Sequence, residues 1–341
     1  MESHYYNASA ADSFGSAAGL IRQSKKPIKD VTDWLSGQDA YTLHRRIVRR
    51  FKRRKTYSKG INDLWQIDLV DLSWLAKDND GYRYLLMCID VLSKYGRVQI
   101  LKTKSATAVR DAFATMITDV KPTFVQSDKG TEFLNATFQK LLSDNDIKHY
   151  TSENDDLKCA VVERWNRTIL ERLFRYLAYK NTTRYIDVVQ DIVQSYNRSF
   201  HSSIKMAPAD ATVDNEADIR KRLYPPKPKT VKYRFSIDDT VRISGTRRTF
   251  EKGYRGNWTH ELFKISSRYP TDPPTYGLTD QSGEDIKGKF YTQELQKVKA
   301  RDVYKIERVI KTRKRKGKTE YFVKWLGYPD KFNSWVTDII T

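Results

Sequence analysis

The chain has 341 residues, of which 39% are hydrophobic and 12% aromatic, enough for two or three domains with apolar cores. Its 62 Lys and Arg residues outnumber 42 Asp and Glu residues, and the formal net charge of +20 indicates an anionic partner, typically nucleic acid. Only two cysteines occur, Cys88 and Cys159, which excludes a disulfide framework and a zinc site built on cysteine pairs. Neither an apolar run of membrane-spanning length nor an apolar signal-peptide core is present, so we expect a soluble, intracellular protein.

Residues 1–58 are predicted to form an arm. Residues 1–28 are rich in Ser, Ala and Gly without sustained periodicity, so we expect them to be largely disordered, followed by a short helix between Val31 and His44. From Arg45 to Lys55, eight of eleven residues are Arg or Lys. Such a block suits DNA phosphates, a nuclear-import signal or a solvated basic linker, and the sequence leaves these open. Its candidate DNA contacts are Arg45, Arg46, Arg49, Arg50, Lys52, Arg53, Arg54 and Lys55.

The pattern of residues 59–212 predicts an α/β domain. Apolar strands are expected at Leu64–Val70, Tyr82–Leu92, Arg97–Leu101, Thr123–Gln126 and Ile147–Thr151. Helices are expected between Ser105 and Pro122, over 131–142, along the stripe from Val162 to Tyr176, and over 186–197. A three-stranded meander followed by alternating helix and strand predicts a mixed five-stranded sheet with helices on both faces.

The remaining chain is predicted to be a linker and two all-β regions. Residues 213–230 resemble a linker with a stiff, proline-rich end. Short alternating strands in residues 231–300 predict a small barrel. Its basic side chains lie among aromatic ones, which suits DNA binding, with protein–protein packing as the alternative; the candidates are Arg247, Arg248, Lys252 and Arg255. Residues 301–341 predict three further strands, with the basic turn Arg313–Gly317 between the first two.

Three carboxylates stand beside apolar segments that can hold them rigidly. Asp68 lies within a strand, Asp128 follows a strand, and Glu163 lies on a helix face away from its apolar stripe. Carboxylates held in this way suit two divalent metal ions in phosphoryl transfer, with one acid bridging both ions. Asp68 at mid-strand is the natural bridge. Asp71 competes with it, but lies three residues farther along the strand and therefore on the other face.

The segments around these acids resemble the signatures of the retroviral-integrase superfamily: Trp65–Asp68, Ser127–Phe133 and Val162–Arg167. The spacing supports the resemblance, since 34 residues lie between Asp128 and Glu163, one fewer than is usual. The resemblance covers about residues 60–211. It implies an RNase H-like fold, a D-D-E triad that is both catalytic and metal-binding, and Mg²⁺ or Mn²⁺ as cofactor. The implied activity is 3′-end processing and strand transfer of DNA.

The polar segment Ser152–Lys158 precedes the helix of Glu163 and is expected to be a mobile loop. We expect it to become ordered only when metal and DNA bind, so that Glu163 is poorly placed in a structure without DNA. The candidate DNA contacts around this acid are Lys158, Asn166 and Arg167.

The last segment resembles a chromodomain, notably in Tyr321–Tyr328 and Asn333–Trp335. Carried over by position, an aromatic cage for a methylated lysine, acting through cation–π attraction, would consist of Tyr304, Trp325 and Tyr328. The alternative is that these aromatic side chains belong to the core. The C-terminal helix of the family is missing from the sequence up to Thr341, and Val336 stands where an acidic residue is common.

The order of basic arm, core, small barrel and chromodomain resembles the integrases of Maverick/Polinton DNA transposons and virophages. Related retrotransposon integrases carry a His-His-Cys-Cys zinc module ahead of the core, but this chain has only His4 and His44 there, so no zinc is expected. We therefore expect a nuclear polynucleotidyl transferase that joins transposon or viral DNA ends to target DNA as a dimer or larger oligomer, with a methylated histone tail as a further partner. The alternatives are a domesticated chromatin- or DNA-binding protein without catalysis and an RNase H-like nuclease for RNA–DNA hybrids.

Overall fold

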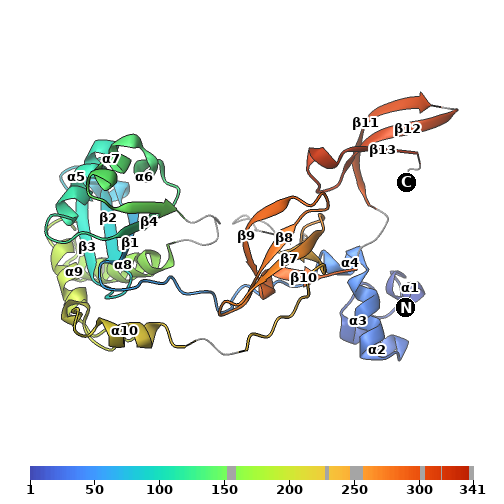
Figure 1. The fold of residues 1–341 in the computed structure, drawn as a ribbon, viewed down its shortest axis with the longest axis horizontal. Helices are drawn as coiled ribbons and strands as arrows, with labels where there is room; N and C mark the ends of the chain where they lie inside the picture. Colours follow the sequence, from blue (N-terminus) through green and yellow to red (C-terminus); the bar gives the residue numbers. More distant parts are fainter. Residues whose placement is uncertain (152–158, 227–229, 246–255, 300–303, 316, 338–341) are drawn as a thin grey trace. The chain divides into compact units, whose positions relative to one another are not determined.

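The computed structural model describes residues 1–151, 159–226, 230–245, 256–299, 304–315 and 317–337 (Figure 1). The chain forms two compact units. The core unit comprises Lys55–Lys227, and the flanking unit comprises Met1–Arg54 together with Pro228–Thr341. None of the helices in the described ranges combines the length and the apolar character that a bilayer span requires.

The core unit is built on a mixed five-stranded sheet in the order β3-β2-β1-β4-β5. The first three strands form an antiparallel meander, β4 runs parallel to β1, and β5 runs parallel to β4. The strands are β1 (Leu64–Asp71), β2 (Tyr84–Asp90), β3 (Gly96–Leu101), β4 (Phe124–Ser127) and β5 (Lys148–Thr151). Each lies within two residues of its predicted position at both ends, so the apolar runs identified the sheet correctly.

Helices cover both faces of this sheet (Figure 1). One face packs against α5 (Ala106–Met116), α6 (Thr131–Leu134) and α7 (Ala136–Asp144), and the other against α8 (Ala160–Lys180) and α9 (Val189–Arg198). Successive side chains of a strand point to opposite faces. Trp65 and Ile67 therefore enter the core beneath α5, while Val70 lies against the core beneath α8. The predicted mixed five-stranded sheet with helices on both faces is confirmed.

A single helix was expected over residues 131–142, but the structure contains two short ones. Asn135 has an extended conformation (φ −76°, ψ 154°) between α6 and α7, and its side-chain oxygen accepts a hydrogen bond from the backbone N–H of Phe138 at 2.9 Å. Asn is favoured at such N-cap positions because it satisfies a free backbone donor of the next helix. The apolar periodicity continues through this break, and the break was therefore missed.

Residues 213–230 were expected to be a linker, but the structure contains a helix there, α10 (Glu216–Leu223). Ile219 and Leu223 on this helix are buried against Leu92 and Ile204 of the core unit. The helix is rich in charge and carries only two buried apolar side chains, so its sequence looks like a solvated connector. The predicted boundary of the core at residue 212 is too early, and the compact unit extends to Lys227.

Gly96 at the start of β3 allows α8 to approach the sheet closely. A Cβ atom at this position would lie 2.1 Å from Cζ2 of Trp165, a separation that van der Waals repulsion forbids. Asn197 on α9 secures the same glycine, because its side-chain amide accepts from the Gly96 N–H and donates to the Gly96 carbonyl, both at 2.9 Å. These contacts fix α8 and α9 on the sheet.

The first 28 residues were expected to be largely disordered, and this prediction is wrong for the parts that form helices. α1 (Glu2–Tyr5), α2 (Ala17–Ser24), α3 (Ile28–Ser36) and α4 (Asp39–Thr42) belong to the flanking unit. Their core consists of side chains widely spaced in the sequence: Tyr5, Leu20, Val31 and Leu35. Single apolar residues in separate short helices produce no detectable period, because periodicity needs a longer helix.

The all-β region of the flanking unit is a five-stranded antiparallel sheet in the order β10-β6-β7-β8-β9. Its strands are β6 (Thr240–Ile243), β7 (Phe263–Tyr269), β8 (Thr275–Thr279), β9 (Asp285–Tyr291) and β10 (Leu295–Lys297). Val241, Ile265 and Tyr276 form the centre of its core. The predicted all-β character is confirmed, while the three-residue β10 was not predicted.

The described residues from Tyr304 to Thr337, which we call the chromo region after the resemblance noted above, contain three antiparallel strands, β11 (Ile306–Arg315), β12 (Lys318–Trp325) and β13 (Ser334–Val336). It is tied to the all-β sheet by Lys331, whose ammonium pairs with Asp280 at 2.5 Å and also with Glu284. Tyr328 is buried (8% exposed), and the neighbouring Gly327 lies against His260. The three predicted strands are all present.

Candidate active site

β1 places Asp68 on the face of the sheet that carries α8. Gln66, Asp68 and Val70 share this face because they are two residues apart. The Asp68 carboxylate accepts hydrogen bonds from the side-chain N–H of Asn166 at 2.7 Å and from the backbone N–H of Leu69 at 2.9 Å. Both bonds fix the carboxylate in one orientation.

Glu163 lies in the first turn of α8. As predicted, the stripe on the neighbouring face, with Val162, Trp165 and Ile169, is buried, whereas Glu163 and Arg167 are exposed. The helix therefore rests on the sheet through its apolar stripe and presents the acid to solvent.

Gln66 supplies the hydrogen bonds that the N-terminus of α8 lacks from its own N-cap residue. Its side-chain oxygen accepts from the backbone N–H groups of Val161 and Val162, at 3.0 and 3.1 Å. Its side-chain nitrogen donates to Gln126 on β4 at 2.7 Å. Free N–H groups at a helix N-terminus need such partners when buried, and Gln66 is fully buried. The strand that carries Asp68 thereby also positions the helix that carries Glu163.

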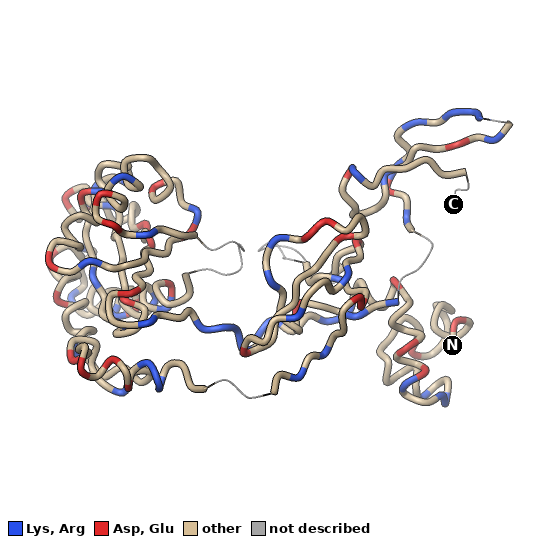
Figure 2. The backbone as a smooth tube through the Cα atoms, in the orientation of Figure 1, with Lys and Arg blue, Asp and Glu red and all other residues tan. Residues whose placement is uncertain are grey.

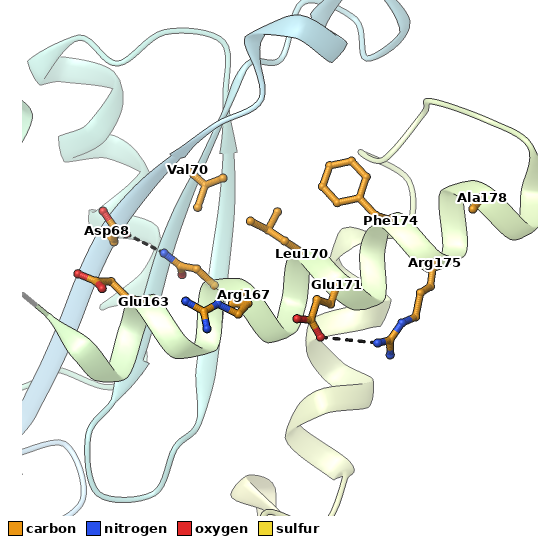
Figure 3. A pocket seen from close by; sticks show the side chains of 10 residues that line it. Asp68, Val70, Glu163, Arg167, Leu170, Glu171, Phe174, Arg175 and Ala178 are labelled. Atoms are coloured by element: carbon orange, nitrogen blue, oxygen red, sulfur yellow. Dashed lines mark hydrogen bonds and ion pairs between the residues drawn. The ribbon is translucent and has the colours of Figure 1, made fainter. Parts of the chain in front are cut away.

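Asp68 and Glu163 line one cleft of about 790 Å³ that continues along α8. Figure 3 shows both carboxylates at one end of the cleft and Phe174 and Arg175 farther along the helix. Arg167 also lines the cleft and lies near the two acids (Figure 3). The cleft therefore combines two of the three predicted acids with a cation.

Asp128 directly follows β4, and its carboxylate accepts a hydrogen bond from the Gly130 N–H at 3.0 Å. It is not among the residues that line the cleft. β4 is parallel to β1 with Gln126 opposite Gln66, so a continuation of this register by two residues leads from Asp68 to Asp128. The parallel pairing of β1 and β4 thus brings Asp128 to the position beside Asp68 at the end of the neighbouring strand.

The three acids interact electrostatically. The pKa of Asp68 is raised from its ordinary value to about 6, chiefly by burial and also by the charges of Asp128 and Glu163, while the hydrogen bonds from Leu69 and Asn166 oppose the shift. Burial also raises the pKa of the Cys159 thiol to about 12, again with contributions from all three carboxylates. Cys159 is therefore a neutral thiol beside the acids rather than a thiolate nucleophile.

The side chains at this site have the chemistry of a divalent-cation site. Carboxylate oxygens are the ligands that Mg²⁺ prefers, and the pKa of Asp68 is raised first by burial and then by the charges of Asp128 and Glu163. The side-chain oxygen of Asn166 is buried and has no hydrogen-bond partner within the described structure, so an acceptor beside Asp68 is free for a hydrated ion. Among the described residues, no group of three or more His, Cys, Asp or Glu side chains is arranged closely enough to hold a metal ion.

Asp71 lies away from this site, as the strand period predicts. It is exposed at the end of β1, where its carboxylate accepts from the Ser73 N–H at 2.8 Å. Hydrogen bonds from the Ser73 side chain and then from its backbone N–H lower the pKa of Asp71.

The predicted basic arm packs along the all-β region within the flanking unit. The Arg45 carbonyl accepts from the Trp258 indole at 2.8 Å, and Lys52 pairs with Asp272 at 2.7 Å. Arg53 lies 3.7 Å from a carboxylate oxygen of Glu294, and the Arg54 N–H donates to the Tyr291 hydroxyl. Arg45, Arg46, Arg49 and Arg50 have exposed side chains that can meet an anion. Part of the arm therefore holds the unit together, and the rest remains a predicted DNA contact.

Other predicted DNA contacts are divided between the core unit and undescribed segments. Lys55 belongs to the core unit and donates to the Leu223 carbonyl at 2.8 Å. Arg167 lies at the acids, whereas Asn166 is buried and orients Asp68 instead of facing solvent. The loop 152–158 with Lys158 lies outside the described residues, as do Arg247, Arg248, Lys252 and Arg255.

The three predicted cage residues come together in the chromo region. The Tyr304 ring lies 6.0 Å from Trp325 and 5.7 Å from Tyr328, measured between centroids, with steep interplanar angles of 66° and 89°. The adjoining pocket, lined by Tyr304 and Tyr328, holds only about 20 Å³, close to the room of one water molecule. The rings thus have the expected grouping, and binding of a methylated lysine remains a prediction.

Sequence reasoning missed Gln66. The residue stands two positions before Asp68 in the Trp65–Asp68 segment, so the strand period places it on the same face. Its role as acceptor for the N-terminus of α8 depends on where that helix packs, and no local sequence pattern predicts this position.

Comparison with known proteins gives two domain matches. Residues 59–156 match the integrase core domain, and residues 304–339 match the chromo (chromatin organisation modifier) domain. A transposon-derived protein of Caenorhabditis elegans is 36% identical over 225 residues, which cover 65% of this chain and 74% of that protein. Ty1 Gag-Pol polyproteins of Saccharomyces cerevisiae are 31% identical over 100 residues, which cover 27% of this chain and only 6% of the polyprotein.

The fold is also similar to a solved structure. A chain in the cryo-electron microscopy structure of a simian T-cell lymphotropic virus intasome superimposes with a TM-score of 0.56 at 12% identity. The match covers 84% of this chain and 99% of that chain. This likeness concerns the fold, and the family rests on the relative from Caenorhabditis elegans together with the core-domain match. The chain therefore belongs to the integrase superfamily with an RNase H-like core, and it carries a chromo domain in its C-terminal region.

Proposed function

We propose that this protein is a DNA integrase, a polynucleotidyl transferase that trims the 3′ ends of transposon or viral DNA and joins them to target DNA. The observation that carries the proposal is the placement of Asp68 and Glu163 in one cleft of an integrase core, with the charge of Asp128 acting on Asp68. Integrases of Maverick/Polinton transposons and virophages are the group we propose as nearest.

In this proposal Asp68, Asp128 and Glu163 would hold Mg²⁺ or Mn²⁺, two ions per active site. Bound there, the ions would activate the attacking oxygen and stabilise the leaving oxygen of an in-line phosphoryl displacement. The other side chains have separate tasks. Asn166 holds the Asp68 carboxylate in place through its 2.7 Å hydrogen bond, and Arg167 offers a positive charge to a DNA phosphate beside the acids.

The partners we propose follow from the charge and the domains. Transposon or viral DNA ends and target DNA match the formal charge of +20, and a methylated histone tail would suit the aromatic rings of the chromo region. Joining two ends requires at least a dimer. The basic block Arg45–Lys55 supports import into the nucleus, where target DNA is found.

A joining assay tests the proposal. Purified full-length protein is incubated with Mg²⁺, a target plasmid and a duplex that matches the terminal repeats flanking the coding sequence. Wild type should join the duplex to the plasmid, and Glu163→Gln should lower the joining rate at least about 1,000-fold, because it removes a metal-binding charge. DNA affinity, measured by fluorescence anisotropy, should change less than about threefold.

Glu171→Gln is the matched control, since Glu171 lies on the same helix and lines the same cleft, where it faces Arg175 at 3.6 Å. This variant should join DNA at close to the wild-type rate. Binding without any joining by wild type would instead support a domesticated DNA-binding protein, and cleavage confined to RNA–DNA hybrids would support a nuclease. Joining by Glu163→Gln at the wild-type rate would contradict the assignment of the acids.

A further inference from the structure

The hairpin of β11 and β12 extends beyond the third strand of the chromo region. β13 pairs only with residues Tyr321–Val323 of β12, whereas the β11–β12 pairing continues outward to Arg315 opposite Lys318. We name this outer segment, Lys311–Arg315 with Lys318–Glu320, the basic ribbon. Every described β11 residue in it is exposed. Figure 1 shows β11 and β12 as a two-stranded projection, and Figure 2 shows basic residues along it.

The basic ribbon carries a large excess of positive charge. It contains five described cations, Lys311, Arg313, Lys314, Arg315 and Lys318, and a single acid, Glu320. Glu320 pairs with Arg313 at 2.5 Å. Within the described structure, no acidic side chain forms an ion pair with the other four cations.

The strand register concentrates these charges. Arg315 stands opposite Lys318, Arg313 opposite Glu320 and Lys311 opposite Phe322. Directly opposed residues of an antiparallel pair project to the same face, and like charges in such a pair destabilise it. The Arg315–Lys318 pair therefore costs folding free energy that an anion placed over this face would offset.

Aromatic packing gives the ribbon a rigid base. The Arg313 guanidinium lies 3.9 Å from the centre of the Trp335 ring, and Trp335 packs against Phe322 with ring centroids 5.3 Å apart. These contacts fix the inner end of the ribbon on β13, so that the outer cations project from a defined platform.

We propose that the basic ribbon binds double-stranded DNA through its phosphates, with the two strands entering the major groove. That groove of B-form DNA is about 12 Å wide and admits a two-stranded β-ribbon, whereas the major groove of A-form RNA is too narrow for side chains. Unpaired Lys and Arg side chains on both strands of the ribbon match the phosphate rows along the groove. The chromo region is thereby a DNA-contacting element in addition to any role toward histones, and this holds whether or not the core joins DNA.

The test compares the salt dependence of binding in the full-length protein. A ribbon variant, Lys314→Ser with Arg315→Ser and Lys318→Ser, removes three outer cations and leaves the Arg313–Trp335 contact intact. A matched control, Lys121→Ser with Lys140→Ser and Lys148→Ser, removes three exposed cations from the core unit. Affinity for a 30-base-pair duplex is measured by anisotropy from about 50 to 300 mM salt.

The slope of log affinity against log salt should fall by about 2 to 3 for the ribbon variant, because each phosphate contact contributes about 0.9. Its affinity at physiological salt should fall at least about tenfold. In wild type, duplex DNA should protect Lys311, Lys314 and Lys318 from an amine-acylating reagent, while Lys121 stays reactive. An unchanged slope with unprotected ribbon lysines would overturn the proposal, and so would equal protection by duplex RNA or by an acidic peptide.

Discussion

At Asp68, burial and two neighbouring carboxylates work against ionisation, and hydrogen bonds from Asn166 and Leu69 offset them only in part. A carboxyl whose pKa is raised in the folded state contributes most to stability when protonated, below its ordinary pKa of 3.8, and that contribution is lost as pH rises through about 6. The metal-free protein therefore carries a cost at neutral pH at the residue that we propose as the bridging ligand.

Asp68→Asn should remove this cost. In EDTA, the free energy of unfolding of the variant should exceed that of wild type by about 1 to 3 kcal/mol at pH 7.5, and the difference should shrink toward zero near pH 4. Urea denaturation at several pH values measures it. Asp71→Asn is the control, because Asp71 is exposed with a lowered pKa, and it should not stabilise the protein at neutral pH. A stability difference for Asp68→Asn that is independent of pH would contradict the account.

At the scale of elements, Gln66 links the strand that carries Asp68 to the helix that carries Glu163, because it accepts hydrogen bonds from the first turn of α8. Periodicity and capping signals in the sequence were sufficient for β1 to β5, for α5 with its Ser105 cap, and for the exposed face of α8 that carries Glu163. They were insufficient for α1 and α2, whose buried apolar side chains lie far apart in sequence, and for α10, a charged helix with only two buried apolar side chains. They also could not find the Gln66 contacts, since these depend on how α8 packs across β1.

Gln66→Met should loosen the start of α8. The substitution leaves the Val161 and Val162 N–H groups without an acceptor, and each buried unpaired donor costs about 1 to 3 kcal/mol, so we expect a loss of about 2 to 4 kcal/mol. Amide hydrogen exchange at these two residues should accelerate. Gln190→Met, which removes one hydrogen bond to the Val98 carbonyl from an exposed position, is the control and should cost less than about 1 kcal/mol. Retained protection at Val161 and Val162 would count against the capping role.

At the scale of the whole molecule, the chain is two compact units, and the core unit includes α10. The helix is bonded to the first residues of the unit as well as packed on them. Glu216 accepts from the Ile61 N–H at 3.0 Å, and Arg220 donates to the Lys59 carbonyl at 2.7 Å. The segment that was expected to be a linker therefore closes the core.

A truncation tests this boundary. A fragment of residues 55–227 should fold alone, and a fragment of residues 55–212 should be less stable by about 3 to 5 kcal/mol, because it loses the buried side chains of Ile219 and Leu223. Urea midpoints of the two fragments measure the difference. Equal midpoints would show that α10 contributes nothing to the core unit.

We propose that the three acids act as one unit, and Asp128 provides the most stringent test because it does not line the cleft. The decisive measurement is the Mg²⁺-dependent joining rate of Asp68→Asn, Asp128→Asn and Glu163→Gln, each alone and all three combined. Residues that act as a unit are strongly non-additive, so each single substitution should lower the rate to the same floor as the triple variant. Joining by Asp128→Asn at a rate near wild type, or a triple variant far slower than every single one, would contradict the account.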